Sequence, residues 1–172
     1  MDTAISQPDL EALAALVGNL LLARGEALAT AESCTGGWIA QCATAIPGSS
    51  VWFDRGFVTY SNAAKMELLG VPETTLARHG AVSEATARAM AQGAIAHSGA
   101  DWAVAVTGIA GPTGGTPDKP IGLVCFAWAE RDGGCEARSL HFDGDRATVR
   151  ARSVRHALRG LLERLGTEPR LV

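Results

Sequence analysis

The sequence lacks a run of basic residues, a long apolar segment and an excess of either charge. Its formal net charge is −3, and Lys and Arg are nowhere dense enough to follow a phosphate backbone, which argues against a nucleic-acid partner. No apolar run is long enough to cross a membrane. Because Asp2, Asp9 and Glu11 interrupt the apolar stretch near the start, we expect no signal peptide and a cytoplasmic protein.

Disulfide and metal-ligand patterns are also missing. The chain has four cysteines, which are too few and too scattered for a disulfide framework and form no CxxC pair. Its four histidines show neither HExxH nor another metal-ligand spacing. We therefore expect reduced thiols that pack as small hydrophobes, and neither a metal nor a cofactor.

The composition that is present is that of a folded domain. Of the 172 residues, 47% are hydrophobic and 19% are charged, which is ordinary for a globular chain. A chain of this length can bury well over half of its unfolded surface in one core. We expect one domain that covers residues 1–172.

Apolar spacing and turn residues predict helices interspersed with strands. Helices are expected at 9–24, after the segment ESCTGG, from Ser61 to Gly70, from Ser83 through Ile95, and from Asp145 to Leu165. Strands are expected at 27–30, 102–106, 121–129 and 135–142, the last two as an antiparallel hairpin. Together these elements predict an α/β fold, a three-layer α/β/α sandwich with a mixed sheet.

Residues 51–60 combine two kinds of signal. Aromatic and β-branched residues favour a strand, whereas Asp54-Arg55-Gly56 has the chemistry of a turn. The pattern predicts two short segments that fold back on each other, with Phe53 opposite Phe57.

Three polar clusters fall where predicted elements end, which is where binding residues concentrate. They are 33–37 (SCTGG), then Ser49-Ser50 with Tyr60-Ser61-Asn62 and Lys65, then Thr107-Gly108 with the glycine-rich loop after it. Each cluster alone is more simply explained by turns and helix caps, but all three together indicate a site. The glycine-rich loop has no Walker lysine, so a nucleoside-triphosphate loop is unsupported.

With these clusters in view, the sequence resembles the CinA C-terminal domain family, whose members include nicotinamide-nucleotide amidohydrolases. The segments that carry the resemblance are TAESCTGG, IPGSSVWFDRGFVTYSNAAK, HGAVSE, TGIAGPTGG and the later GDR, in order over nearly the whole chain. The resemblance implies hydrolysis of the carboxamide of nicotinamide mononucleotide, giving nicotinic acid mononucleotide and ammonia in pyridine nucleotide recycling. It also implies a homo-oligomer.

By this resemblance the family's catalytic serine, tyrosine and lysine fall on Ser50, Tyr60 and Lys65. Tyr60 would then hold or polarise the other two. We assign Ser33 to substrate hydrogen bonding, although its place before a helix N-terminus makes it the rival nucleophile.

A mononucleotide substrate also brings a phosphate, which calls for amides at a helix start and a fixed cation. Gly36, Gly37 and Arg146 meet that description. By its position alone Arg146 is more simply a solvated surface arginine, and the resemblance at GDR is what favours it as the cation. Thr107 and Gly108 end a predicted strand and can bond the carboxamide or the ribose.

The chemistry sets a condition on Lys65. An amide hydrolase needs a nucleophile, donors for the oxyanion, and a group that takes the nucleophile's proton and returns it to ammonia. Lysine is such a base only when neutral, yet at a pKa of about 10.4 only about 0.04% is neutral at pH 7. The sequence therefore predicts that Lys65 is buried beside the serine.

Chain distance sets a second condition, because an extended chain would place Ser50 about 33 Å from Tyr60. Either the predicted hairpin brings Ser50 opposite Tyr60, or a second subunit completes the site. The alternative function is a noncatalytic nucleotide-binding or regulatory domain, since CinA-type domains also occur fused to another enzymatic domain.

Overall fold

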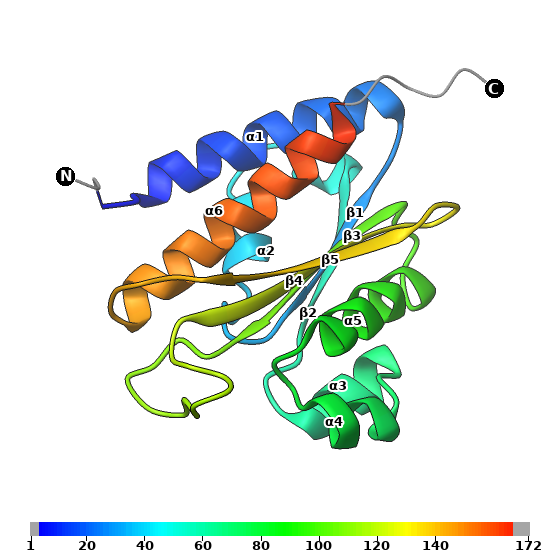
Figure 1. Ribbon diagram of the computed structural model, residues 1–172. Helices are drawn as coiled ribbons and strands as arrows, with labels where there is room; N and C mark the ends of the chain where they lie inside the picture. Colours follow the sequence, from blue (N-terminus) through cyan, green and yellow to red (C-terminus); the bar gives the residue numbers. More distant parts are fainter. Residues whose placement is uncertain (1–3, 167–172) are drawn as a thin grey trace.

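The computed structural model describes residues 4–166, which form one α/β domain with a five-stranded sheet between two layers of helices (Figure 1). This confirms the predicted fold class. In chain order the elements are α1 (Gln7–Arg24), β1 (Leu28–Glu32), α2 (Trp38–Thr44), the 3₁₀ turn η1 (Ser49–Val51), β2 (Phe53–Val58), α3 (Asn62–Leu69), α4 (Glu73–His79), α5 (Glu84–Ala96), β3 (Trp102–Gly108), β4 (Leu123–Glu130), β5 (Cys135–His141) and α6 (Arg146–Leu165). Helix α4 was not predicted from the sequence.

The sheet is mixed, with strand order β2-β1-β3-β4-β5. Strands β2, β1 and β3 are parallel, whereas β4 is antiparallel to both β3 and β5. The carboxyl ends of β1, β2, β3 and β5 therefore lie at one edge of the sheet. In open α/β sheets this is the edge where ligands bind.

Each face of the sheet has its own core. Helices α1, α2 and α6 cover one face and α3, α4 and α5 cover the other (Figure 1). Strand β3 shows why the two layers differ, since Trp102, Val104 and Val106 pack in the first core. The intervening Ala103 and Ala105 pack in the second, where small side chains let α5 lie close to the sheet.

Helix ends follow the predicted capping chemistry. Ser61, Ser83 and Asp145 each precede a helix and accept a hydrogen bond from the backbone N–H three residues on, as expected. Helix α1 begins two residues before the predicted start, because Ser6 and Asp9 form a capping box. None of the helices within residues 4–166 combines the length and apolar character needed to cross a membrane.

The predicted fold-back of residues 51–60 is wrong. Strand β2 continues through Asp54-Arg55-Gly56 and pairs in parallel with β1, placing Arg55 opposite Ala29 and Gly56 opposite Thr30 after a register shift at Asp54. The glycine serves close packing instead of a turn. A Cβ on Gly56 would lie 2.9 Å from Thr30 Oγ1 and 3.0 Å from Ala40 Cβ, so a side chain there would collide with α2.

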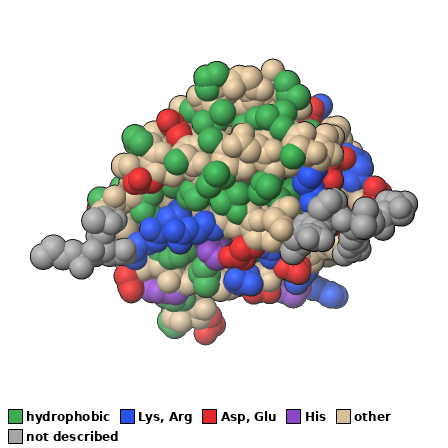
Figure 2. Space-filling model, turned by 90° about the horizontal axis from the view of Figure 1, so that it is seen from above, with side chains coloured by type: hydrophobic (Ala, Val, Ile, Leu, Met, Phe, Trp, Pro, Cys, Tyr) green, Lys and Arg blue, Asp and Glu red, His purple; other side chains and the backbone are tan. Residues whose placement is uncertain are grey.

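The outer face of the α1–α6 layer carries hydrophobic side chains among polar ones, as Figure 2 shows. Leu16 and Leu22 of α1 are each about half exposed, at 52% and 48%. The predicted homo-oligomer stays a prediction.

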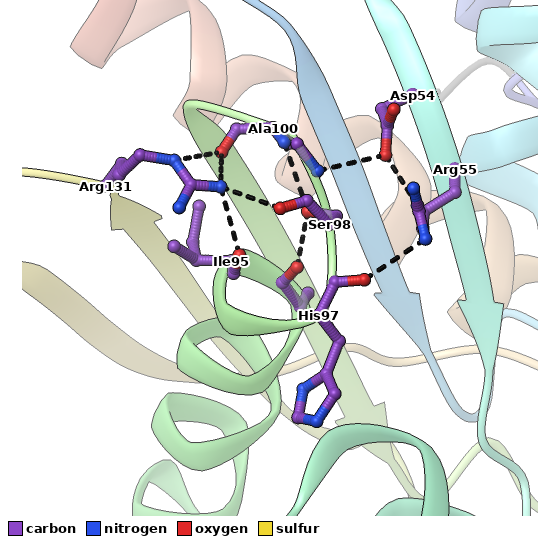
Figure 3. Close-up of polar contacts among 9 residues, drawn as sticks. Asp54, Arg55, Ile95, His97, Ser98, Ala100 and Arg131 are labelled. Atoms are coloured by element: carbon purple, nitrogen blue, oxygen red, sulfur yellow. Dashed lines mark hydrogen bonds and ion pairs between the residues drawn. The ribbon is translucent and has the colours of Figure 1, made fainter.

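Two arginine side chains, one from the β4–β5 turn and one from β2, hydrogen-bond to the chain between α5 and β3 (Figure 3). Arg131, from the β4–β5 turn, donates to the carbonyl oxygens of Ile95, Ser98 and Ala100 at 2.7–3.1 Å. From β2, Arg55 donates to the His97 carbonyl at 3.2 Å. Both guanidinium groups thus lie at the C-terminus of α5, where the helix dipole favours positive charge.

We expect Arg131→Gln to lower the free energy of unfolding by about 1–3 kcal/mol, because several charge-assisted hydrogen bonds to otherwise unpaired carbonyls are lost. Urea unfolding followed by circular dichroism measures the change. The matched control is Arg138→Gln on β5, whose side chain is exposed, and it should shift stability by less than about 0.5 kcal/mol. Equal losses of stability in the two variants would contradict the view that the hydrogen bonds of Arg131 stabilise the chain between α5 and β3.

Candidate functional site

The site forms at the carboxyl edge of the sheet. The loop after β1 supplies Ser33, the segment after β2 supplies Tyr60 and leads into α3 with Lys65, and β3 ends at Gly108. The first turn of α6 supplies Arg146. Parts of all three predicted polar clusters therefore meet at this edge.

Lys65 is the centre of the site. It is 1% exposed, and its Nζ lies 3.1 Å from Ser33 Oγ and donates to the Thr59 carbonyl at 2.9 Å. A third, longer contact joins Nζ to the Tyr60 carbonyl at 3.5 Å. Ser61 caps α3 and so fixes the turn that carries Lys65 over the end of β2. The predicted burial of Lys65 beside a serine is found, but the serine is Ser33.

The surroundings of Lys65 favour a neutral amine. Burial lowers the pKa of Lys65 from its ordinary value of 10.5, and the nearby Cys34 thiol opposes this only in part. Among residues 4–166, Lys65 has no carboxylate within ion-pair distance. Burial raises the pKa of Cys34 itself to about 12, which makes it a poor nucleophile at neutral pH.

Ser50 does not lie beside Lys65 in this chain. Ser50 belongs to η1, before β2 begins, whereas Lys65 follows the end of β2. A strand of 6 residues spans about 20 Å, so the two side chains lie at opposite edges of the sheet. The hairpin that would have brought Ser50 to Tyr60 is absent, and only a second subunit could supply Ser50 to this site.

Tyr60 and Arg146 form a pair at the mouth of the site. The Tyr60 side chain is 64% exposed, and its hydroxyl accepts a hydrogen bond from Arg146 Nη2 at 3.1 Å. Arg146 Nη1 donates to the Gly111 carbonyl at 2.8 Å, which ties α6 to the glycine-rich loop. The Tyr60 hydroxyl thus contacts Arg146, and it is the backbone carbonyl of Tyr60 that approaches the lysine.

The N-terminus of α2 is less available to an anion than predicted. Gly36 and Gly37 adopt left-handed conformations, with φ of 62° and 94°. The first free amides of α2, from Ile39 and Ala40, donate to the buried carboxylate of Glu32 at 2.9 and 3.0 Å. An acidic side chain of the protein thus already occupies the helix N-terminus.

Arg150 and Glu32 are site residues that sequence reasoning missed. Arg150 lies one turn after Arg146 on α6, donates to the carbonyls of Cys34 and Thr35 at 3.0 and 3.2 Å, and stacks over the Trp38 ring. The sequence offered one signal for Glu32, the glycine at the N-cap of α2. Because glycine has no side chain, the first amides of that helix need an acceptor from another part of the chain.

Thr107 and Gly108 lie at the predicted strand end, but both have structural contacts. The buried Thr107 hydroxyl donates to the Ala81 carbonyl at 2.7 Å. A Cβ on Gly108 would lie 2.8 Å from a Val124 side-chain atom, so glycine is needed for close strand packing. Within residues 4–166, no group of three or more His, Cys, Asp or Glu side chains is arranged to hold a metal ion.

Comparison with known proteins agrees with this architecture. A family model described as the CinA C-terminal domain matches residues 10–165. The chain is 58% identical to a Symbiobacterium thermophilum protein named as competence-damage inducible, covering 87% of this chain and 37% of that protein. It is 51% identical to the nicotinamide-nucleotide amidohydrolase PncC of Escherichia coli K12, covering 91% and 95%. The crystal structure of competence/damage inducible protein CihA from Agrobacterium tumefaciens has a TM-score of 0.89 at 45% identity, covering 97% and 100%.

We expect Lys65 to titrate below the ordinary lysine value of 10.5, because burial disfavours its ammonium form. The chain has only two lysines, Lys65 and Lys119, so protein labelled with ¹³C at the lysine Cε should give two resonances. The Lys65→Met variant identifies the Lys65 signal by its loss. A midpoint for that signal at or above 10.5 would refute the effect of burial.

Proposed function

Because the chain belongs to the CinA C-terminal domain family, we propose that it hydrolyses the carboxamide of nicotinamide mononucleotide, giving nicotinic acid mononucleotide and ammonia. The E. coli relative named as a nicotinamide-nucleotide amidohydrolase supports this, because the similarity covers almost all of both chains. The reaction fits a role in pyridine nucleotide recycling in the cytoplasm.

The observation that carries the proposal is the distance of 3.1 Å between Lys65 Nζ and Ser33 Oγ. Neutral Lys65 accepts the Ser33 proton as the serine oxygen bonds to the carboxamide carbon. When the carbon–nitrogen bond breaks, Lys65 returns this proton to the leaving ammonia. Lys65 then takes a proton from water, which attacks the ester of Ser33, and returning that proton to Ser33 releases the carboxylic acid.

The loop after Ser33 offers donors for the oxyanion formed at each step. Within residues 4–166, the backbone N–H groups of Thr35 and Gly37 donate to no acceptor. Such preorganised amides stabilise developing negative charge because they need no reorganisation during the reaction. We assign them this role, with Thr107 and Gly108 lining the same edge of the sheet.

Arg146 is the cation we assign to the substrate phosphate, with Tyr60 as its partner. The two side chains form one exposed hydrogen-bonded pair at the mouth of the site. A guanidinium group suits phosphate because it donates several hydrogen bonds in one plane. Gly36 and Gly37 shape the neighbouring loop, whose helix amides are already bound by Glu32.

Ser50 could act as the nucleophile only if a second subunit of a homo-oligomer placed it beside Lys65. The alternative function is a noncatalytic nucleotide-binding or regulatory domain, because the S. thermophilum relative, of which this chain spans 37%, is a longer protein. Binding of nicotinamide mononucleotide without ammonia release would support that alternative.

The nucleophile is tested by ammonia release from nicotinamide mononucleotide, measured with a chelator present. Ser33→Ala should lower kcat by at least about 10³-fold, because the attacking group is removed. Lys65→Met should lower it by about 10²- to 10⁴-fold. Native activity should fall as the pH drops below the pKa of Lys65, since protonated lysine accepts no proton.

Ser50→Ala is the matched control and should keep kcat within about threefold of the native value, a change of less than 1 kcal/mol in the barrier. Full activity in Ser33→Ala with loss in Ser50→Ala would return the nucleophile's role to Ser50. A mixture of inactive Ser50→Ala and inactive Lys65→Met chains that regains activity would then place the site across two subunits.

Arg146→Gln should raise KM for nicotinamide mononucleotide by at least about 10-fold, the loss expected for a hydrogen bond to a charged group. The same variant should change KM for nicotinamide riboside, which lacks the phosphate, by less than about 3-fold. Arg155→Gln is the control, because Arg155 lies on the same helix beside Leu13 and Leu16 of α1. Equal losses with both substrates would contradict a phosphate contact.

A further inference from the structure

Glu32 is a buried carboxylate next to the proposed nucleophile. It ends β1 directly before Ser33 and is 0% exposed. One carboxylate oxygen accepts from Thr35 Oγ1 at 2.8 Å and from the Ile39 N–H at 2.9 Å, and the other accepts from the Ala40 N–H at 3.0 Å. The loop from Ser33 to Gly37 is therefore closed around this side chain.

The main chain of Glu32 supports the other half of the site. Its carbonyl accepts from the Thr59 N–H at 2.9 Å, and the Thr59 carbonyl in turn accepts from Lys65 Nζ at 2.9 Å. One residue is thus hydrogen-bonded to the loop that carries Ser33 and to the segment that holds Lys65.

The chemistry of the contacts suits an ionised side chain. Burial raises the pKa of Glu32 above its ordinary value, and hydrogen bonds from Ile39, Ala40 and Thr35 offset that shift only in part. All three groups donate, so both carboxylate oxygens must accept, and the start of α2 adds the favourable end of a helix dipole. Because Gly37 has no side chain, Glu32 takes the place of the missing N-cap.

We propose that Glu32 is a positioning residue that holds Ser33 Oγ within hydrogen-bond distance of Lys65 Nζ. It does so from two sides, through Thr35 and the first turn of α2, and through the carbonyl that binds Thr59. The proposal rests on the proposed amide hydrolysis, since the effect on turnover is meaningful only if Ser33 and Lys65 react together.

The test compares Glu32→Gln and Thr35→Val with Thr35→Ser. Glutamine has the same shape as glutamate, but its amide nitrogen must face a backbone donor, and valine removes only the Thr35 hydroxyl. Both variants should lower kcat by at least about 10-fold and change KM by less than about 3-fold, because bound substrate meets a displaced nucleophile. Thr35→Ser keeps the same backbone N–H as Thr35→Val and restores the hydroxyl donor, so its kcat should exceed that of Thr35→Val by at least about 5-fold. Thr44→Val, an exposed change at the far end of α2, is the control and should match the native protein.

Hydrogen exchange followed by mass spectrometry gives a readout independent of turnover. Peptides covering 33–40 should exchange faster in Glu32→Gln and Thr35→Val than in the native protein, Thr35→Ser and Thr44→Val, all at a temperature where circular dichroism shows a folded chain. If Glu32→Gln does not fold, Thr35→Val carries the test. Native exchange and native kcat in Thr35→Val would overturn the role of Glu32. A native protein that releases no ammonia would instead contradict the proposed function. The exchange rates would still test whether Glu32 holds residues 33–40 in place.

Discussion

A lysine amine that is held out of water, and whose partners among residues 4–166 are all neutral oxygens, is the interaction on which this site depends. Burial makes the ammonium form of Lys65 costly, and the Thr59 carbonyl and the Ser33 hydroxyl do not supply the negative charge that would restore it. A carboxylate in the same place would raise the pKa of Lys65 and remove the neutral amine that the proposed reaction uses as its base. The fold therefore keeps its nearest buried acid, Glu32, engaged with α2 and Thr35.

The parallel strands explain how distant segments reach this amine. Ser33 follows β1, Lys65 follows β2 through the capped start of α3, and Arg146 opens the helix after β5. Their strands all end at the same edge of the sheet, so residues more than 100 positions apart meet there. The same geometry separates Ser50 from Lys65 of the same chain, because Ser50 precedes β2 and so lies at the opposite edge.

Local signals in the sequence predicted much of the fold. Ser61, Ser83 and Asp145 cap the helices they were expected to cap, and the β4–β5 hairpin forms where its turn residues indicated. The error at residues 51–60 has a specific cause. Gly56 looked like part of a turn, but it is needed where Ala40 of α2 packs against β2, a contact that no local pattern reveals.

The sequence by itself determined the α/β class, the family resemblance and the expectation of a buried Lys65, because caps, apolar spacing and motif segments are local properties. Only the tertiary structure decided which serine meets that lysine. Strand pairing is set by contacts between segments far apart in the chain, and pairing β2 with β1 places Ser33 at Lys65 Nζ while it carries Ser50 away. The contacts of Glu32 and Arg150 could not be predicted from the sequence for the same reason, since their hydrogen-bond partners belong to other elements.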